Sequence, residues 1–130
     1  MSADILARTL YGEARGEPPM GKVAVASVIL NRVAANSWYG GTVEEVCLKP
    51  FQFSTWNKND PNLPKIKAVT ESDPVFAECL FVAKYALAGL FEDPTNGATH
   101  YHASGVTPNW AEGKAPVIEI GRHAFYRGVK

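Results

Sequence analysis

Hydrophobic residues recur at helical spacing in the first segment of the chain, residues 3–17. On a helical wheel, five small or aliphatic residues fall on one side of this segment: Ala3, Leu6, Ala7, Leu10 and Ala14. Asp4 adds negative charge to the first turn, where the helix dipole favours it. Pro18 and Pro19 prevent the helix from extending far past Gly16. The pattern therefore predicts a first helix that begins after Ser2 and buries one face.

Three further segments are predicted to be helical. Residues 21–33 are apolar nearly all round, which is typical of a helix that lies inside a core. Thr42 and Glu45 form a capping-box pattern that opens a short helix. A longer helix begins after Asp73, a favourable capping residue, and continues with apolar residues at helical spacing. Residues 49–64 are rich in aromatic and amide side chains without a period, which predicts a loop.

The C-terminal part of the chain alternates in the manner of β-strands. Residues 98–103 (ATHYHA), 117–120 (VIEI) and 123–127 (HAFYR) are short alternating runs separated by Gly and Pro. They predict a small antiparallel sheet near the C-terminus. Helices followed by a sheet indicate the α+β class. Because no repeat, low-complexity tract or linker interrupts the pattern, we expect a single domain over residues 1–130.

Composition and charge exclude some classes of function. Of 130 residues, 46% are hydrophobic, and 13 basic residues balance 13 acidic ones. This balance gives no basic field to favour nucleic acid or an anionic membrane. No apolar run approaches the length of a membrane span. Cys47 and Cys79 lie in apolar helical contexts outside any CxxC pattern, so we expect buried free thiols and no disulfide.

Two carboxylates lie where the first helix should be apolar. Glu13 and Glu17 are one turn apart and fall beside Leu10 on the wheel. A carboxylate on a buried face is costly unless it is paired, hydrogen-bonded or facing a cavity. Glu13 is therefore either an ion-pair partner of a cation such as Arg15 or Arg32, or a general acid whose pKa is raised by partial burial. Glu17, where the helix ends, is equally explained by capping or by an ion pair.

The segment FQFSTW, residues 51–56, combines aromatic surface with an amide and a hydroxyl, Gln52 and Ser54. Saccharide-binding clefts use this mixture, with flat apolar faces for the pyranose rings and polar groups for their hydroxyls. The alternative is an aromatic loop that packs on the core. Ser54 is not expected to be a nucleophile, because no G-x-S-x-G elbow surrounds it.

Histidines in the strand region admit a metal site as another alternative. His100 and His102 are two residues apart in a predicted strand and so point to one face, and with His123 they could form a three-histidine zinc site. Polar packing explains them equally simply. Three aromatic residues of this region either extend a groove or fill the core: Tyr101, Trp110 and Tyr126.

The order of several motifs resembles a known family. LARTLYGEARGEP, AVASVILNRV, QFS, DPTNGATHYH and IGRHAFY follow one another between Ile5 and Tyr126. This order is similar to that of the catalytic domain of the spore-cortex-lytic cell wall hydrolases, of the SleB/CwlJ type. The resemblance implies a compact fold related to lysozyme and the lytic transglycosylases, with peptidoglycan as the substrate.

The resemblance also assigns expected roles to residues. The first glutamate of GEARGE, Glu13, is implied to be the catalytic acid. Gln52, Phe53 and Ser54 match the cleft motif of the family and are expected to bind substrate. Tyr101 and His102 match a looser aromatic stretch and are expected to join them. This mechanism needs no cofactor and no metal.

The chain also departs from the spore enzymes. It begins without the basic and apolar regions of a signal peptide and shows no separate wall-binding domain. We therefore expect a phage-type or prophage-type endolysin that is made in the cytoplasm and acts on the cell wall after release by a membrane-permeabilising partner. Its expected partners are peptidoglycan glycan strands, with no nucleic acid and no stable membrane association.

Several mechanisms fit these residues. The expected reaction cleaves the bond between N-acetylmuramic acid and N-acetylglucosamine, with Glu13 protonating the glycosidic oxygen. A lytic transglycosylase needs only this carboxylate, whereas a muramidase needs a second one, for which Glu17 is the nearby candidate. A sugar-binding module without catalysis and a zinc amidase that uses the histidines are the alternatives from other classes.

Overall fold

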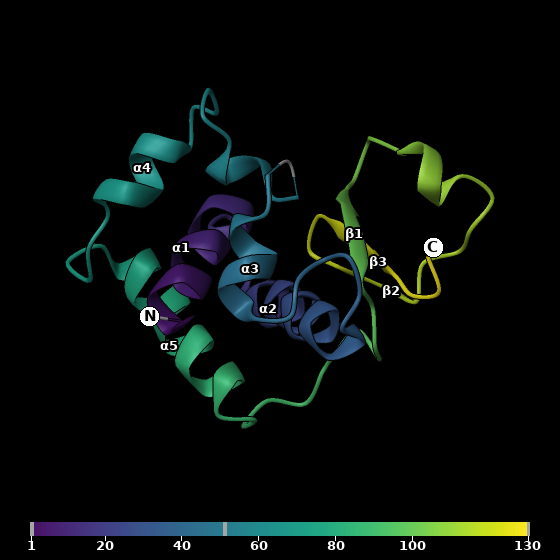
Figure 1. The fold of residues 1–130 in the computed structure, drawn as a ribbon, viewed down its shortest axis with the longest axis horizontal. Coiled ribbons are helices and arrows are strands. Elements are labelled where there is room, and N and C mark those ends of the chain that lie inside the picture. Colours follow the sequence, from purple (N-terminus) through teal and green to yellow (C-terminus); the bar gives the residue numbers. More distant parts are fainter. Residues whose placement is uncertain (1, 51, 130) are drawn as a thin grey trace.

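The computed structural model describes residues 2–50 and 52–129. Helices and a small sheet follow one another along the chain (Figure 1): α1 (Ser2–Ala14), α2 (Pro19–Ala35), α3 (Val43–Leu48), η1 (Ser54–Trp56), α4 (Leu63–Ala68), α5 (Pro74–Leu87), β1 (His100–Ala103), η2 (Asn109–Ala111), β2 (Ile118–Ile120) and β3 (His123–Tyr126). Within this described part, no helix has the length and apolar character that crossing a membrane requires. The α+β class expected from the pattern is confirmed.

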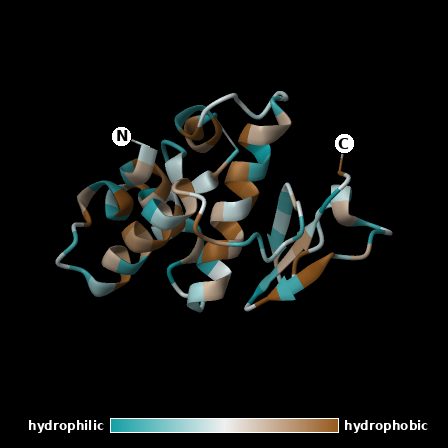
Figure 2. Cartoon of the chain, turned by 90° about the horizontal axis from the view of Figure 1, so that it is seen from below, coloured by the Kyte–Doolittle hydropathy of each residue, from teal (hydrophilic) through white to brown (hydrophobic). Residues whose placement is uncertain are grey.

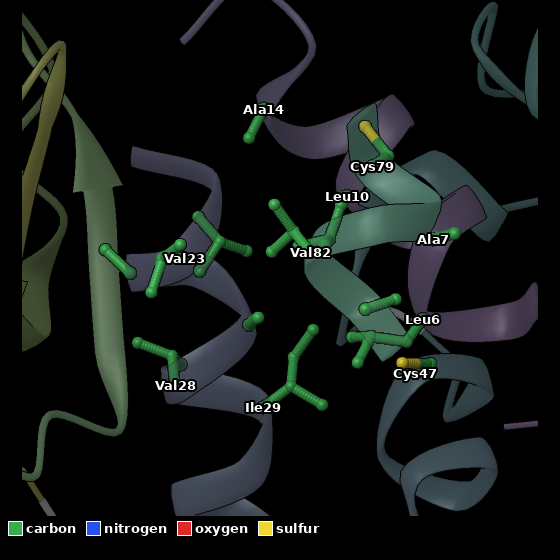
Figure 3. Packing of buried hydrophobic residues seen from close by; sticks show 14 of the residues in the cluster. Leu6, Ala7, Leu10, Ala14, Val23, Val28, Ile29, Cys47, Cys79 and Val82 are labelled. Carbon is green, nitrogen blue, oxygen red and sulfur yellow. The ribbon is translucent and has the colours of Figure 1, made fainter. Parts of the chain in front are cut away.

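α2 lies between the sheet and the other helices, and its side chains are buried nearly all round (Figures 1 and 3). On one side it contacts β1 and β2, and on the other it packs against α1 and α5. This position explains why residues 21–33 lack a polar face. The loops that connect the elements are mostly hydrophilic (Figure 2).

The helical core confirms that the first helix buries the apolar face predicted from the helical wheel. Leu6 and Leu10 of α1 are fully buried and meet Ile29 of α2 and Val82 of α5 in one cluster (Figure 3). Cys47 and Cys79 belong to the same cluster as free, buried thiols. Burial raises the pKa of each thiol to about 12, so both remain uncharged parts of the core.

The sheet has the strand order β1-β3-β2, with both pairs antiparallel. β3 is central and all four of its residues are buried. Tyr101 of β1 lies opposite Phe125 of β3, and His102 lies opposite Ala124. β1 is therefore an edge strand, and it also contacts α2.

A network of short hydrogen bonds fixes the loop that leads into β1. Asp93 accepts hydrogen bonds from the backbone N–H and the hydroxyl of Thr95, at 2.7 and 2.6 Å. Asn31 of α2 donates to Asp93 at 2.8 Å and to the Ala98 carbonyl at 2.9 Å. Arg32 donates to the carbonyl of the following residue, Thr99, at 2.7 Å. Consecutive residues of α2 therefore set the position at which β1 begins.

The structure differs from the sequence pattern between residues 49 and 64, which contains η1 and the start of α4 instead of loop alone. α4 has six residues and no side-chain cap. Arg8 of α1 stabilises its end by donating to the carbonyls of Ile66 and Val69, at 2.6 and 3.0 Å. α4 depends on this tertiary contact, because an uncapped helix of this length has little stability of its own.

Candidate active site

Glu13 lies in the last turn of α1, and its carboxylate is held by donors from two distant segments. The hydroxyl of Tyr101, in β1, donates to Oε1 at 2.6 Å. The backbone N–H of Thr55, in η1, also donates to this carboxylate. A chain separation of 88 residues lies between Glu13 and Tyr101. The tertiary fold therefore brings the late strand and the middle loop onto the carboxylate of the first helix.

Burial raises the pKa of the Glu13 carboxyl above its ordinary value. The hydrogen bonds from Tyr101 and Thr55 act in the opposite direction but do not cancel the effect of burial. The pKa of Tyr101 is itself raised well above its ordinary value, first by burial and then by Glu13. Tyr101 thus keeps its proton and remains a hydrogen-bond donor to the carboxylate.

Among the described residues, Glu13 does not form the ion pair with Arg15 or Arg32 that was considered as an alternative. Arg15 donates to the Tyr11 carbonyl and to Asn62 Oδ1. Arg32 donates to the Thr99 carbonyl, and its charge acts on Glu13 only as a weaker, longer-range influence. Within residues 2–50 and 52–129, Glu13 has no cation within 4.0 Å. The carboxylate is held by neutral donors.

A glycine permits the close contact between α1 and η1 at this point. A Cβ added to Gly12 would lie 2.7 Å from Cβ of Thr55 and would overlap its hydroxyl oxygen. Thr55 is fully buried, so its side chain has no space into which to move. Gly12 therefore allows the Thr55 N–H to reach the neighbouring carboxylate.

The Glu13 carboxylate faces a cavity of about 420 Å³. The residues that line this catalytic cavity come from α1, α2, the segment before and within η1, the start of α4, and the sheet: Gly12, Glu13, Arg32, Gln52, Phe53, Ser54, Asn62, Tyr101, His102, Ala103 and His123. All five predicted substrate-binding residues are among them. Phe51, the first residue of the FQFSTW segment, lies outside the described residues.

The predicted loop residues contribute different surfaces to the cavity. Gln52 donates to the carbonyls of Tyr39 and Val46, at 3.1 and 2.6 Å, which orients its amide. Its Oε1 is buried and has no hydrogen-bond partner among the described residues. Ser54 is exposed. Phe53 is buried beneath the Arg32 guanidinium, 5.3 Å from its ring centroid, and thus supports the floor of the cavity.

His102 is fixed by two contacts. Its Nδ1 lies 2.9 Å from the Ala103 carbonyl and its Nε2 lies 2.9 Å from the Tyr126 hydroxyl. Because a carbonyl can only accept, Nδ1 is the protonated nitrogen, and in the neutral ring Nε2 accepts from Tyr126. Tyr126 is buried and packs against Trp110. Of the two roles considered for this residue from the sequence, groove or core, the structure shows the second, because Tyr126 fills a second, smaller core.

Glu17 does not line the cavity and has a structural role behind the lining residue His123. Its Oε1 accepts a hydrogen bond from the Arg122 N–H at 2.9 Å, in the turn between β2 and β3. Oε1 also lies 3.7 Å from Nδ1 of His123. Gly121, at φ +58°, leaves space for the carboxylate, which a Cβ there would overlap. Glu17 therefore links the end of α1 to the sheet and is not positioned across the cavity from Glu13.

The strand register separates the three histidines. His100 and His102 lie on one face of the sheet with Tyr126, and both rings pack on Trp110. His123 lies on the other face, with its ring centroid 4.8 Å from that of Tyr101. No group of three potential metal ligands occurs among the described residues. The three histidines cannot converge on a single ion.

A larger cavity, of about 690 Å³, lies beside the segment from Leu48 to Pro61. Its only carboxylate is Asp60, which accepts a hydrogen bond from the Asn62 N–H at 2.8 Å. This cavity lacks the pairing of an acid with fixed donors that the catalytic cavity has. The Glu13 carboxylate is held by donors from two distant segments, whereas the donor to Asp60 is only two residues away along the chain.

Comparisons with known proteins agree with this geometry. A model of the cell wall hydrolase family matches residues 16–126. The chain belongs to the cell wall hydrolase family. The matched interval begins after Glu13, so the assignment of this residue rests on its geometry and on the motif resemblance. Family membership confirms the resemblance seen in the order of motifs.

Individual relatives are spore enzymes. The spore cortex-lytic enzyme of Bacillus cereus is 34% identical over 126 residues, which cover 93% of this chain and 42% of that protein. The enzyme of Bacillus subtilis is 31% identical and matches 93% of this chain and 36% of its own length. The chain thus spans less than half the length of these relatives.

Two solved structures share the fold. The catalytic domain of the Bacillus cereus SleB protein has a TM-score of 0.68 and 30% identity, with 95% of this chain and 88% of that chain covered. The catalytic domain of the germination-specific lytic transglycosylase SleB from Bacillus anthracis has a TM-score of 0.72 and 31% identity, with 95% and 92% covered. The expected lysozyme-like fold class is confirmed by these matches.

Four residues at the site were not identified from the sequence as parts of it. Arg32 was considered only as an ion-pair partner and helix end, and Asn62 and Thr55 belonged to a segment without a period. His123 is considered from the sequence only as a metal ligand or as polar packing, but it lines the cavity. The charge of Arg32 on a largely apolar helix is a signal for such a role, because a cation in a core helix requires a polar neighbour, although Lys22 of the same helix carries the same signal.

Proposed function

We propose that this chain is a peptidoglycan-cleaving glycosidase that acts as a lytic transglycosylase with Glu13 as its acid and base. The observation that carries this proposal is the pairing of a partly buried carboxyl with fixed neutral donors in a cavity whose lining contains no second carboxylate. The family and the similar lytic transglycosylase domain support it.

The reaction has two steps at the same carboxyl. Protonated Glu13 donates its proton to the glycosidic oxygen, and the bond from that oxygen to C1 of the muramic unit breaks as positive charge develops in the ring. The carboxylate then takes the proton of the muramic 6-hydroxyl, whose oxygen bonds to C1. The products are a free 4-hydroxyl on glucosamine and a 1,6-anhydro muramic end. Water is not consumed, and Glu13 regains its proton.

The donors around Glu13 serve both steps. A raised pKa keeps the carboxyl protonated for the first step, and Tyr101 and the Thr55 N–H stabilise the carboxylate that the first step leaves. Gln52 and Ser54 line the cavity, and the exposed Ser54 supplies a hydroxyl on its wall for the sugar. These substrate-binding roles remain predictions.

A muramidase is the second candidate. Asp60 favours it, because its charge reaches Glu13 and adds to the rise of its pKa. Hydrolysis would require this carboxylate, or Glu17, to activate water or to act as the nucleophile. Since Glu17 is held by Arg122, Asp60 is the better candidate for that role. Asp60→Asn separates the mechanisms, because it would abolish hydrolysis and leave transglycosylation in place.

Digestion of purified sacculi followed by mass spectrometry tests the proposal. We expect 1,6-anhydro ends from the native protein and a loss of more than about a hundredfold in Glu13→Gln, because Gln cannot transfer the proton. Glu71→Gln, at an exposed position, is the matched control. Wild-type-like lysis by Glu13→Gln would refute the assignment of the acid.

Other products would select other mechanisms. Reducing ends would indicate the muramidase, and release of stem peptide with a free amine would indicate an amidase. Binding to sacculi without any cleavage would indicate a sugar-binding module.

We propose the cell wall as the place of action, because this substrate lies outside the cytoplasmic membrane. An endolysin that is released by a membrane-permeabilising partner is the form of this activity that we propose. Lysis of cells from within, on coexpression with a membrane-permeabilising protein, is the result this form requires.

A further inference from the structure

A second cavity, of about 440 Å³, adjoins the catalytic cavity and shares two of its walls, Arg32 and Gln52. The new part of its lining includes Trp38, from the loop after α2, and Trp110, from η2. The two cavities therefore form neighbouring compartments along β1, with the Glu13 carboxylate in the first.

The second cavity offers aromatic surface that packing does not use. Trp38 is 61% exposed, although it is one of the largest apolar side chains of the protein. Trp110 is partly buried, and the ring of His100 lies against it, with centroids 5.0 Å apart. Burial lowers the pKa of His100 to about 4, so this ring is neutral near neutral pH. Exposed indole faces are the surfaces on which pyranose rings stack.

The charge of the second cavity is positive. Among the described residues, its lining contains Arg32 and Lys49 and no carboxylate side chain. Nζ of Lys49 lies 6.0 Å from the ring centroid of Trp38, so an anion that reaches Lys49 is adjacent to the indole. Arg32 is buried and uses its Nε on the Thr99 carbonyl, whereas Lys49 is exposed. Lys49 is therefore the cation available to a ligand.

We propose that this second cavity is a saccharide subsite for the next disaccharide of the same glycan strand, whose sugar rings stack on Trp38 and Trp110 and whose muramic unit places a carboxylate of its lactyl or stem-peptide substituent at Lys49. This inference rests on the proposed function, since it assigns the occupant of the cavity next to the acid. A polymer needs such a subsite, because binding energy away from the cleaved bond holds that bond in place against Glu13.

Substitutions at Trp38 and Lys49 test the subsite without altering the acid. Trp38→Ala is expected to lower kcat/KM on long glycan strands by about tenfold or more, and to change it little on the shortest fragment that is cleaved. Trp38→Phe keeps an aromatic face and should restore most of the activity. Phe81→Ala is the matched control, because Phe81 is an exposed aromatic residue of α5 that lines neither cavity.

Lys49→Gln tests the anionic part of the proposal in a binding assay. In the Glu13→Gln background, which holds strands without cleaving them, Lys49→Gln should weaken binding of muramyl strands and reduce its dependence on salt. Binding of N-acetylglucosamine oligomers, which have no carboxylate, should not change. Thermal unfolding of each variant checks that the fold is retained.

The results separate failure of the subsite from failure of the proposed function. If the native protein cleaves strands and Trp38→Ala behaves as Phe81→Ala on all lengths, the subsite is refuted and the function stands. If the native protein binds strands through Trp38 but cleaves none, the subsite stands and the proposed function is refuted. An equal loss on short and long substrates would also overturn the subsite.

Discussion

Gly12→Ala should be destabilising, although alanine is the better helix former. Gly12 lies inside α1, where replacement of glycine by alanine ordinarily gains about 1 kcal/mol. Here the added methyl group would lie 2.7 Å from Cβ of Thr55 and 2.9 Å from its Cγ2. Thr55 is fully buried in η1, so relief requires η1 to move away from α1.

The size of the effect follows from two opposing contributions. Inserting a methyl group into a filled site costs about 1–3 kcal/mol. Subtracting the gain in helix propensity, about 1 kcal/mol, leaves a net loss of about 0–2 kcal/mol in the free energy of unfolding. Displacement of η1 also draws the Thr55 N–H away from Glu13. A misplacement of about 1 Å at a catalytic group lowers activity by about a hundredfold.

Urea unfolding and kcat/KM on sacculi measure the two effects. Thr55→Gly removes all the atoms that the new methyl group meets, so the double variant should be more stable than the sum of the single changes predicts. Gly16→Ala is the control, because a Cβ there meets nothing within 4 Å. Its stability should remain within about 0.5 kcal/mol of the native protein. A stabilised, fully active Gly12→Ala protein, without coupling to Thr55→Gly, would refute the reasoning.

Three further outcomes are expected from the same geometry. Tyr101→Phe removes a donor to the carboxylate and so raises the pKa of Glu13 further. The alkaline limb of the pH profile of kcat/KM should therefore move to higher pH, and an unmoved limb would contradict the role of Tyr101. Glu17→Gln should keep activity within about tenfold of the native protein because the amide oxygen still accepts from Arg122, whereas Glu17→Ala should lose about 1 kcal/mol of stability in urea. Full activity is expected after exhaustive treatment with a chelator, because the proposed proton transfers at Glu13 use no Lewis acid; loss that zinc restores would favour the amidase.

The partly buried position of the Glu13 carboxyl was predictable from the sequence because it depends on local periodicity. Glu13 falls beside Leu10 on any regular helix, and the structure places Leu10 in the core and the carboxylate at its edge. The identity of its partners was not predictable in this way. Tyr101 reaches Glu13 only because β1 is an edge strand whose register places Tyr101 opposite Phe125, and strand order is not encoded in the alternation of a single strand.

The middle segment shows where local patterns fail. α4 begins with Leu63 and Pro64 and has no side-chain cap, so neither its start nor its face is visible in the sequence. Its stability comes from the carbonyls that Arg8 binds, and Arg8 lies on the face of α1 opposite the apolar stripe. Asn62 and Thr55 reach the site because this segment is held against α1. Their positions are therefore a consequence of tertiary contacts.

The opposing influences on Glu13 are what an acid that must also act as a base requires. Burial raises its pKa, so the folded state binds this proton more tightly than the unfolded chain does. The resulting stability is fully present below the ordinary pKa of a glutamate and is lost as the pH rises through the raised value. The buried carboxyl thus lowers the stability of the fold at pH values above its raised pKa.

Burial alone would make the carboxylate too unfavourable to form when the proton leaves. The donors from Tyr101 and Thr55 limit that penalty, and they are neutral, so they do not lower the pKa as far as a cation in contact would. An arginine paired with Glu13 would hold it ionised and prevent the first step. The contacts of Arg15 and Arg32 with carbonyl and amide oxygens elsewhere are therefore as important to the chemistry as the hydroxyl that touches the acid.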